Sequence, residues 1–223
     1  MRLLREEFDR SPELARFLPF FIFVLLTACQ GLFGTDGKYW MYVAKTLAGV
    51  WLIWEMRPFV AEMRWALSWE SVVVGIAVCV MWIGIDPLYP KLSKPAQIWN
   101  PHTLPGASPG LAWMFVLVRL LGSTFVVPPL EEVFYRSFLY RYLVRLNFLS
   151  MPLSRFHPLS FVVTSIVFGP GEHVQWLAGI LCGMAYQWLV IRKNRLGDAM
   201  TAHAITNFLL GLWVIGKGDW AFW

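Results

Sequence analysis

Seven polar residues lie in stretches of this sequence that are otherwise apolar. They are Glu131, Glu132, Arg136, Glu172, His173, His203 and Asn207. A charged or imidazole group at membrane depth is costly unless it is paired, so each of these residues is a candidate site residue. Carboxylate, imidazole and amide groups together can activate a water molecule and hold an oxyanion. The set therefore indicates hydrolytic chemistry in an apolar environment.

The two glutamates of PPLEEVFYR (128–136) are expected to act differently. On a helix, Glu132 and Arg136 are four positions apart and can form an ion pair. Glu131 points about 100° away and has Tyr135, not an opposite charge, four positions later. We therefore predict that Glu131 is a general base without a charged partner and that the Glu132–Arg136 pair supports it. The alternative is a helix at the membrane surface with both glutamates in water.

The histidines stand on two further apolar segments. His203 and Asn207 in HAITN are four positions apart and share one helical face. His173 follows GPGE and is expected in the first turn of a helix. A single histidine in a membrane helix more often packs than reacts. Two histidines, an asparagine and a glutamate on three segments favour a site.

The composition predicts an integral membrane protein. With 57% hydrophobic and 15% charged residues, the 223-residue chain is too apolar for an ordinary soluble domain. We expect one all-α membrane domain, 1–223, a polytopic bundle of about six to eight transmembrane helices. Lys45 lies inside the second span and Arg119 inside the fourth. The six clear spans are 17–34, 39–56, 71–85, 111–130, 173–191 and 196–216; the amphipathic 131–149 and the short 158–169 are two further candidates.

Charge and cysteine content give further predictions about partners, disulfides and topology. The formal charge of +5 is attributed to juxtamembrane Lys and Arg residues, so no nucleic-acid partner is expected. The three scattered cysteines predict no disulfide framework. The N-terminal sixteen residues are predicted to include a short surface helix that leads into the first span, with no cleaved signal, and Ser11 in SPEL is predicted to cap a helix start. These residues and RKNR (192–195) are both predicted to be cytoplasmic, which requires an even number of spans between them. The proline-rich 86–110 loop either covers a site or lies on the surface.

Three motifs resemble a known family. EEVFYR (131–136) matches the E-E-x-x-x-R signature of the CAAX prenyl endopeptidase and bacteriocin-processing family of glutamate-type intramembrane endopeptidases. FGPGEH (168–173) and HAITN (203–207) resemble its second and third motifs, in the right order. His173 follows Phe168 by five positions, one more than is usual. The chain is also similar to a bacterial branch that occurs with exosortase-type sorting systems.

The resemblance implies a catalytic core at 109–216, preceded by N-terminal spans and a loop at 1–108. By position, Glu131 would activate water, His173 would help to orient it, and His203 and Asn207 would hold the oxyanion. Glu132, Arg136, Phe168 and Glu172 would support the site. The implied substrate is a membrane-associated protein or peptide, lipidated in some family members, cut near its C-terminus at the inner membrane of a bacterium.

Three other functions remain open at this stage. A zinc-dependent intramembrane protease could use the same Glu and His residues, although no H-E-x-x-H motif is present. We predict no metal and no cofactor, with zinc to be tested by a chelator. A non-catalytic scaffold or immunity-type binding protein could retain the polar network for packing. A transporter with Glu131 as a proton relay is disfavoured because no inverted repeat is evident.

Overall fold

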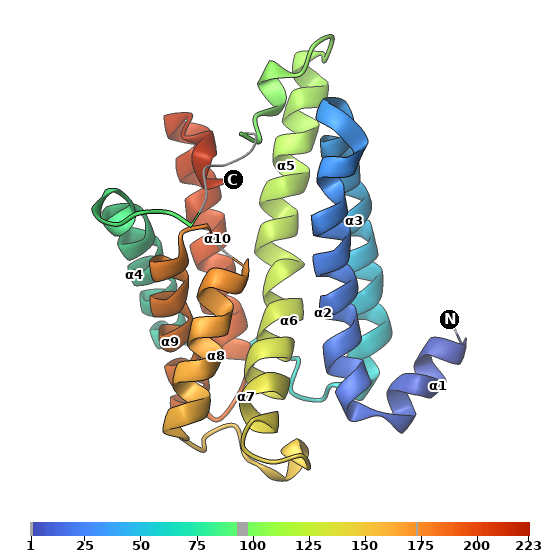
Figure 1. Cartoon of the computed structure of the whole chain (residues 1–223), viewed down its shortest axis with the longest axis vertical. Coiled ribbons are helices and arrows are strands. Elements are labelled where there is room, and N and C mark those ends of the chain that lie inside the picture. The colour runs from blue at the N-terminus through green and yellow to red at the C-terminus, as the bar shows by residue number, and fades with distance from the viewer. Residues whose placement is uncertain (1, 93–97, 173) are drawn as a thin grey trace.

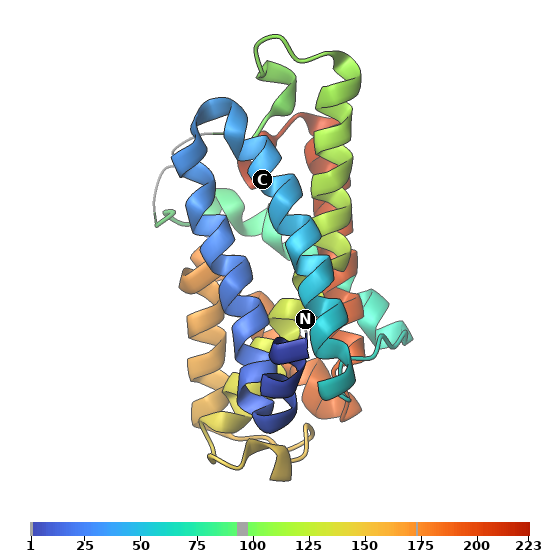
Figure 2. The ribbon, with the colours of Figure 1, turned by 90° about the vertical axis from the view of Figure 1, so that its right-hand side faces the viewer.

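The computed structural model describes residues 2–92, 98–172 and 174–223 and shows helices packed as one bundle (Figure 1). No strand occurs in these ranges, which confirms the predicted all-α class. The main helices are α2 (Pro12–Ala28), α3 (Gly34–Met56), α4 (Trp69–Ile85), α5 (Pro109–Phe125), α8 (Pro158–Glu172), α9 (Trp176–Lys193) and α10 (Gly197–Lys217). In Figure 2, α2 and α3 run side by side, and the short helix α1 lies at their lower end.

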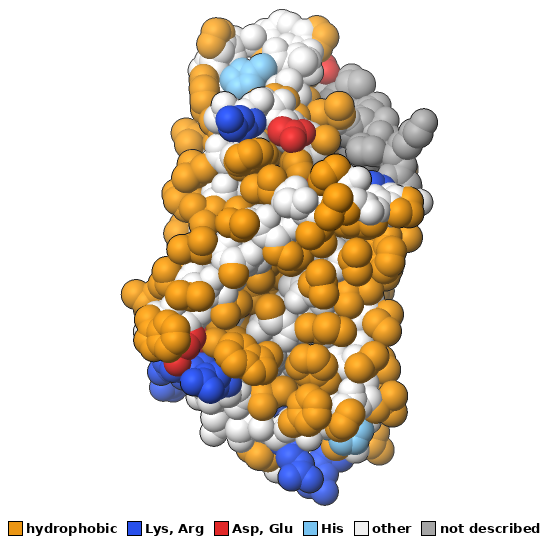
Figure 3. All heavy atoms as spheres, turned by 90° about the vertical axis from the view of Figure 1, so that its left-hand side faces the viewer, with side chains coloured by type: hydrophobic (Ala, Val, Ile, Leu, Met, Phe, Trp, Pro, Cys, Tyr) orange, Lys and Arg blue, Asp and Glu red, His pale blue; other side chains and the backbone are white. Residues whose placement is uncertain are grey.

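Four helical segments of the described chain are long and apolar enough to cross a membrane: Pro12–Phe33, Trp69–Leu88, Pro109–Tyr142 and Gly197–Lys217. Pro158–Gly171 is a shorter apolar helix. Large side chains such as Trp54, Val80 and Leu121 are more than half exposed. Hydrophobic side chains also cover most of the face shown in Figure 3, with Lys and Arg gathered toward its lower end. A surface of this kind suits lipid, and the protein is an integral membrane protein.

The candidate span 131–149 does not form a helix of its own. α5 ends at Phe125 with Val126 as its cap, and the same helical run continues through α6 (Val127–Glu132), a π-helix (Val133–Leu139) and α7 (Tyr140–Tyr142). From the sequence, Pro128 and Pro129 are expected to break or kink the helix just before the two glutamates, and the structure places the irregularity earlier. Pro128 and Pro129 lie in the first turn of α6, where a missing N–H is tolerated, so the irregular residue is Val126. Both glutamates therefore end a short helix inside one long rod.

This continuity accounts for the even number of crossings that the charge pattern requires. The N-terminal end of α2 and the C-terminal end of α9 lie at the same end of the bundle (Figure 1). Between them the described chain passes along the bundle in α2, α3, α4, the 109–142 rod, α8 and α9. The 131–149 segment adds no separate pass. Which end faces the cytoplasm stays a prediction.

The N-terminal residues form the expected surface helix, α1 (Arg2–Arg10). Its Phe8 is buried and packs edge-on against Phe59, and its Arg5 donates a 2.7 Å hydrogen bond to Glu55. Ser11 caps α2 by accepting a 3.1 Å hydrogen bond from the Leu14 N–H, as the sequence predicts.

The boundaries of two other helices differ from the expected ones. α8 extends to Glu172, beyond the predicted 158–169, and α9 begins at Trp176 and not at residue 173. Gly179 and Gly183 have the G-x-x-x-G spacing that is typical of a close helix contact. Such a contact is present at Gly183, where a Cβ atom would lie 3.2 Å from the Cα of Ser165 in α8. This close approach packs α9 directly on α8.

Gly75 brings α4 against α10, the helix that carries His203. A Cβ atom at Gly75 would lie 2.7 Å from the carbonyl oxygen of Ala202 and 2.8 Å from Ile205 Cβ. We expect Gly75→Ala to destabilise the fold by about 1–3 kcal/mol because the backbones must separate. Gly84 of the same helix has no atom near its Cβ position, so Gly84→Ala should stabilise by about 0.5–1 kcal/mol. Unfolding in detergent measures both, and a neutral Gly75→Ala would refute the close contact.

An ionic cluster joins the end of the 109–142 rod to α2 and to the connection between α3 and α4. Glu62 in that connection forms ion pairs with Arg16 (2.9 Å) and Arg141 (2.8 Å), and Ser137 of the π-helix donates a hydrogen bond to the same carboxylate. The cluster fixes the π-helix and the glutamates that precede it.

Acid is expected to weaken this cluster. Burial opposes ionisation of the Glu62 carboxyl, but hydrogen bonds and the charge of Arg16 prevail and lower its pKa from 4.5 to about 2. Because the pKa of Glu62 is lower in the folded state, its ionised carboxylate stabilises the fold at pH values above the pKa of the unfolded chain. This stabilisation is lost as the pH falls from 4.5 toward 2. Thermal unfolding in detergent should therefore show a loss of stability over this range that Glu62→Gln reduces. Equal acid sensitivity of both proteins would contradict the assignment.

Candidate active site

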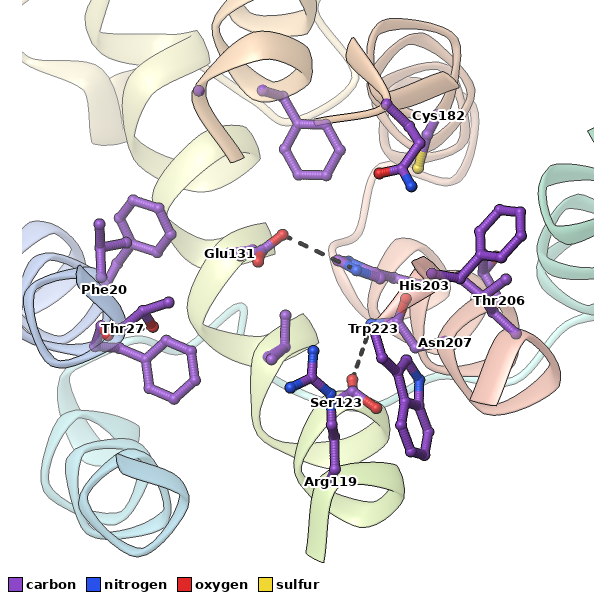
Figure 4. Close-up of a pocket in the computed structure, with 18 of the residues that line it drawn as sticks. Phe20, Thr27, Arg119, Ser123, Glu131, Cys182, His203, Thr206, Asn207 and Trp223 are labelled. Carbon is purple, nitrogen blue, oxygen red and sulfur yellow. Dashed lines mark hydrogen bonds and ion pairs between the residues drawn. The ribbon is translucent and has the colours of Figure 1, made fainter. Parts of the chain in front are cut away.

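A cavity of about 410 Å³ lies inside the bundle. Its wall contains residues of α2, α3, α4, α5, α6, α8, α9 and α10. Its polar wall groups include Glu131, His203 and Asn207, which the sequence analysis singled out. Figure 4 shows that Glu131 comes from the 109–142 rod and that His203 and Asn207 come from α10 across the cavity. The fold therefore brings together residues more than seventy positions apart.

Glu131 is 7% exposed and faces His203. Its Oε2 atom lies 3.9 Å from His203 Nε2 (Figure 4). The prediction that Glu131 stands without a partner is wrong, because sequence spacing considers only neighbours on the same helix. The alternative with both glutamates in water is also excluded, since Glu132 is completely buried.

Glu132 connects two other groups of the site. Its Oε2 atom lies 3.2 Å from Arg136 Nε, which confirms the predicted ion pair. Its Oε1 atom lies 2.9 Å from His203 Nδ1. A carboxylate paired with arginine can only accept, so Nδ1 carries a proton, and Nε2 is the ring nitrogen that faces Glu131. The two glutamates thus contact opposite nitrogens of one imidazole.

Aromatic side chains hold the imidazole in this orientation. Tyr186 stacks on His203 with ring centres 5.1 Å apart, and Phe168 meets it edge-on at 6.2 Å. The Tyr186 hydroxyl donates to Thr206 Oγ1 at 2.7 Å, and Thr206 donates to the Gly75 carbonyl at 2.9 Å. Phe168 also lies under the Arg136 guanidinium at 4.3 Å. Phe168 therefore contacts both His203 and Arg136.

Asn207 is fixed by the 109–142 rod. Its Nδ2 atom donates a 2.9 Å hydrogen bond to the Ser123 carbonyl (Figure 4). A side-chain amide has two N–H groups, so the second remains for another acceptor. Asn207 and His203 both line the cavity, which confirms that the two residues share a face.

Two of the predicted site residues cannot be placed. His173 lies outside the described residues, and of Glu172 only the helical backbone is described. Gly171 and Gln175, on either side of position 173, line the cavity.

The sequence analysis missed several residues of the site. Tyr186 and Thr206 lie within helices where a Tyr or Thr gives no signal, and only their contacts identify them. Arg119 and Lys45 were visible as charges within spans, and both line the cavity. In the described part of the chain, no group of three or more His, Cys, Asp or Glu side chains has an arrangement that could hold a metal ion.

The fold and the cavity define a class: a multi-pass helical membrane protein with a buried carboxylate, imidazole and amide site. Residues 112–209 match the model of the Rce1-like family, type II CAAX prenyl endopeptidases. The matched region contains both glutamates, His203 and Asn207, and the match supports the resemblance to the CAAX protease family that the motifs carry. No curated protein and no solved structure matches the chain significantly.

Proposed function

We propose that the protein is an intramembrane endopeptidase that uses a water molecule activated by Glu131 to hydrolyse a peptide bond near the C-terminus of a membrane-associated substrate. The observation that carries this proposal is the pair of glutamates on opposite nitrogens of His203, at the wall of a cavity within the helical bundle. The family match supports the same reaction class.

The steps follow from these positions. The Glu131 carboxylate takes a proton from water, and the resulting hydroxide attacks the scissile carbonyl carbon. As the family resemblance implies, the oxyanion that forms is stabilised by the second N–H of Asn207 and by His203, which must also carry a proton on Nε2 in order to donate a hydrogen bond. When the C–N bond breaks, the leaving nitrogen takes the proton back from Glu131. Glu132 and Arg136 act only by fixing the imidazole, and His173 is proposed to orient the water.

The cavity also indicates the kind of substrate. Phe20, Phe23 and Val24 of α2 give it an apolar wall beside the polar groups. We propose that this wall accommodates an apolar segment or a lipid group of the substrate, and that the protein acts in the inner membrane of a bacterium. Membership of the exosortase-associated branch stays a prediction.

The experiment is a comparison of protein termini in membranes from cells with the wild type, with Glu131→Gln and with no copy. Expression of the first two must be equal. Termini that occur only with the wild type would support proteolysis and identify the substrate. A variant that rescues the deletion phenotype with unchanged termini would refute the protease and favour the scaffold. Loss of cleavage with a chelator, restored by zinc, would favour the metalloprotease.

A further inference from the structure

Arg119 is a second charged group of the cavity that the proposed chemistry does not use. It lies within α5, and its guanidinium is surrounded by aromatic rings, with Trp99 at 4.5 Å, Tyr42 at 4.9 Å and Trp223 at 5.5 Å. Among the residues that the structure describes, no Asp or Glu forms an ion pair with it. A cation is costly in a membrane-spanning helix, and an anionic ligand would offset that cost.

Lys45 adds a second positive charge to the same cavity. It belongs to α3 and is 6% exposed. Its Nζ atom donates to Thr27 Oγ1 at 3.1 Å and lies 4.5 Å above the Tyr42 ring that Arg119 also contacts. Two helices thus present cations around Tyr42. The cavity has a cationic part and, at Glu131, an acidic part.

Arg119 and Glu131, one from each part, both belong to the 109–142 rod. Arg119 precedes Ser123 by one helical turn, and Ser123 holds Asn207 of the proposed oxyanion site. In Figure 4, Arg119 and Glu131 project from the same helical run, with Ser123 between them. A substrate peptide bound along the cavity would therefore contact the reactive groups at one end and the cations at the other.

We propose that Arg119, assisted by Lys45, binds the α-carboxylate of the substrate's C-terminus. This inference rests on the proposed function and adds to it the feature by which the substrate is selected. A guanidinium offers a planar pair of N–H donors that matches a carboxylate, and a desolvated site strengthens both hydrogen bonds. The aromatic rings hold the guanidinium in place and exclude water.

The spacing sets the length of the released peptide. Arg119 and Glu131 are twelve positions apart, which is about 18 Å along a helix. An extended chain covers about 3.5 Å per residue, so about five residues span this distance. The reach of the arginine side chain shortens the interval. The protein is therefore expected to cut within about five residues of a free C-terminus.

The loop 86–110 contributes to this site. Trp99, from its described C-terminal part, is 5% exposed and covers Arg119. The Asn100 carbonyl accepts a 2.8 Å hydrogen bond from the Tyr39 hydroxyl, which anchors this part of the loop on α3. Of the two roles that the sequence left open for the loop, its described part supports the covering of a site.

The test is a binding comparison in nanodiscs with the Glu131→Gln protein, which should bind peptides without cleaving them. The probe is a fluorescent, N-myristoylated peptide library, prepared once with free α-carboxylates and once as C-terminal amides. We expect the acid to bind about tenfold more tightly than the amide, as a charge-assisted pair provides. Arg119→Gln should remove this preference, and Arg119→Lys should keep part of it.

The control is Arg192→Gln, which removes an exposed arginine that also lies over a tryptophan, Trp188 at 5.6 Å. It should leave the preference unchanged. Because the acid-to-amide ratio is internal to each protein, a loss of folded protein cannot imitate the result. Equal binding of acid and amide to the Glu131→Gln protein that retains Arg119 would overturn the carboxylate site. If the acid is preferred but the wild-type protein shows no proteolytic activity, the carboxylate site is supported and only the proposed function is contradicted.

Discussion

Replacement of Glu131 by glutamine is expected to reduce peptide hydrolysis about 10²- to 10⁴-fold, the range that a general base contributes. Glutamine has nearly the same shape and keeps the side chain in the cavity wall, but it cannot take a proton from water. The loss should therefore appear in kcat, with little change in the affinity for substrate. Purified protein in nanodiscs, assayed on the substrate found from the changed termini, provides the measurement.

The matched control is Glu7→Gln, which makes the same chemical change at an exposed residue of α1. Its activity should equal that of the wild type. A Glu131→Gln protein that is folded and cleaves at more than about a tenth of the wild-type rate would exclude Glu131 as the base.

Replacement of Arg136 by methionine is expected to have the largest effect on stability. Arg136 is 1% exposed, and its ion pair partner Glu132 is completely buried. Removing the cation leaves a buried carboxylate with only His203 as a partner in the described structure, which costs about 3–5 kcal/mol. Unfolding in detergent should show this loss, and activity should fall with it because His203 loses its fixed orientation.

Two further variants test whether the buried charge of Glu132 causes the loss of stability in Arg136→Met. Arg145→Met changes an exposed arginine of the same segment and should alter stability by no more than about 0.5 kcal/mol. Glu132→Gln combined with Arg136→Met removes both charges and should be more stable than Arg136→Met alone. If the double variant is less stable than the single one, charge burial is not the reason for the loss.

Local sequence spacing predicted those features that depend on one helix. The Glu132–Arg136 pair and the common face of His203 and Asn207 follow from helical geometry, and both are present. Local spacing also favours a break at Pro128 and Pro129, but the helix α6 runs through both residues. A proline interrupts hydrogen bonding, but whether a helix then ends or continues depends on the surrounding helices, here through the contacts of Glu62 with Arg141 and Ser137.

The sequence by itself determined the membrane class, the all-α fold and the residue types of the site, because hydropathy and motif spacing are properties of the chain. Only the tertiary structure decided that His203 lies between the two glutamates and that Tyr186 orients it. The same holds for Arg119 and Lys45, which share a cavity although they belong to different helices. Contacts between helices far apart in the chain depend on how small residues such as Gly75 and Gly183 let those helices approach, and no local pattern encodes the resulting register.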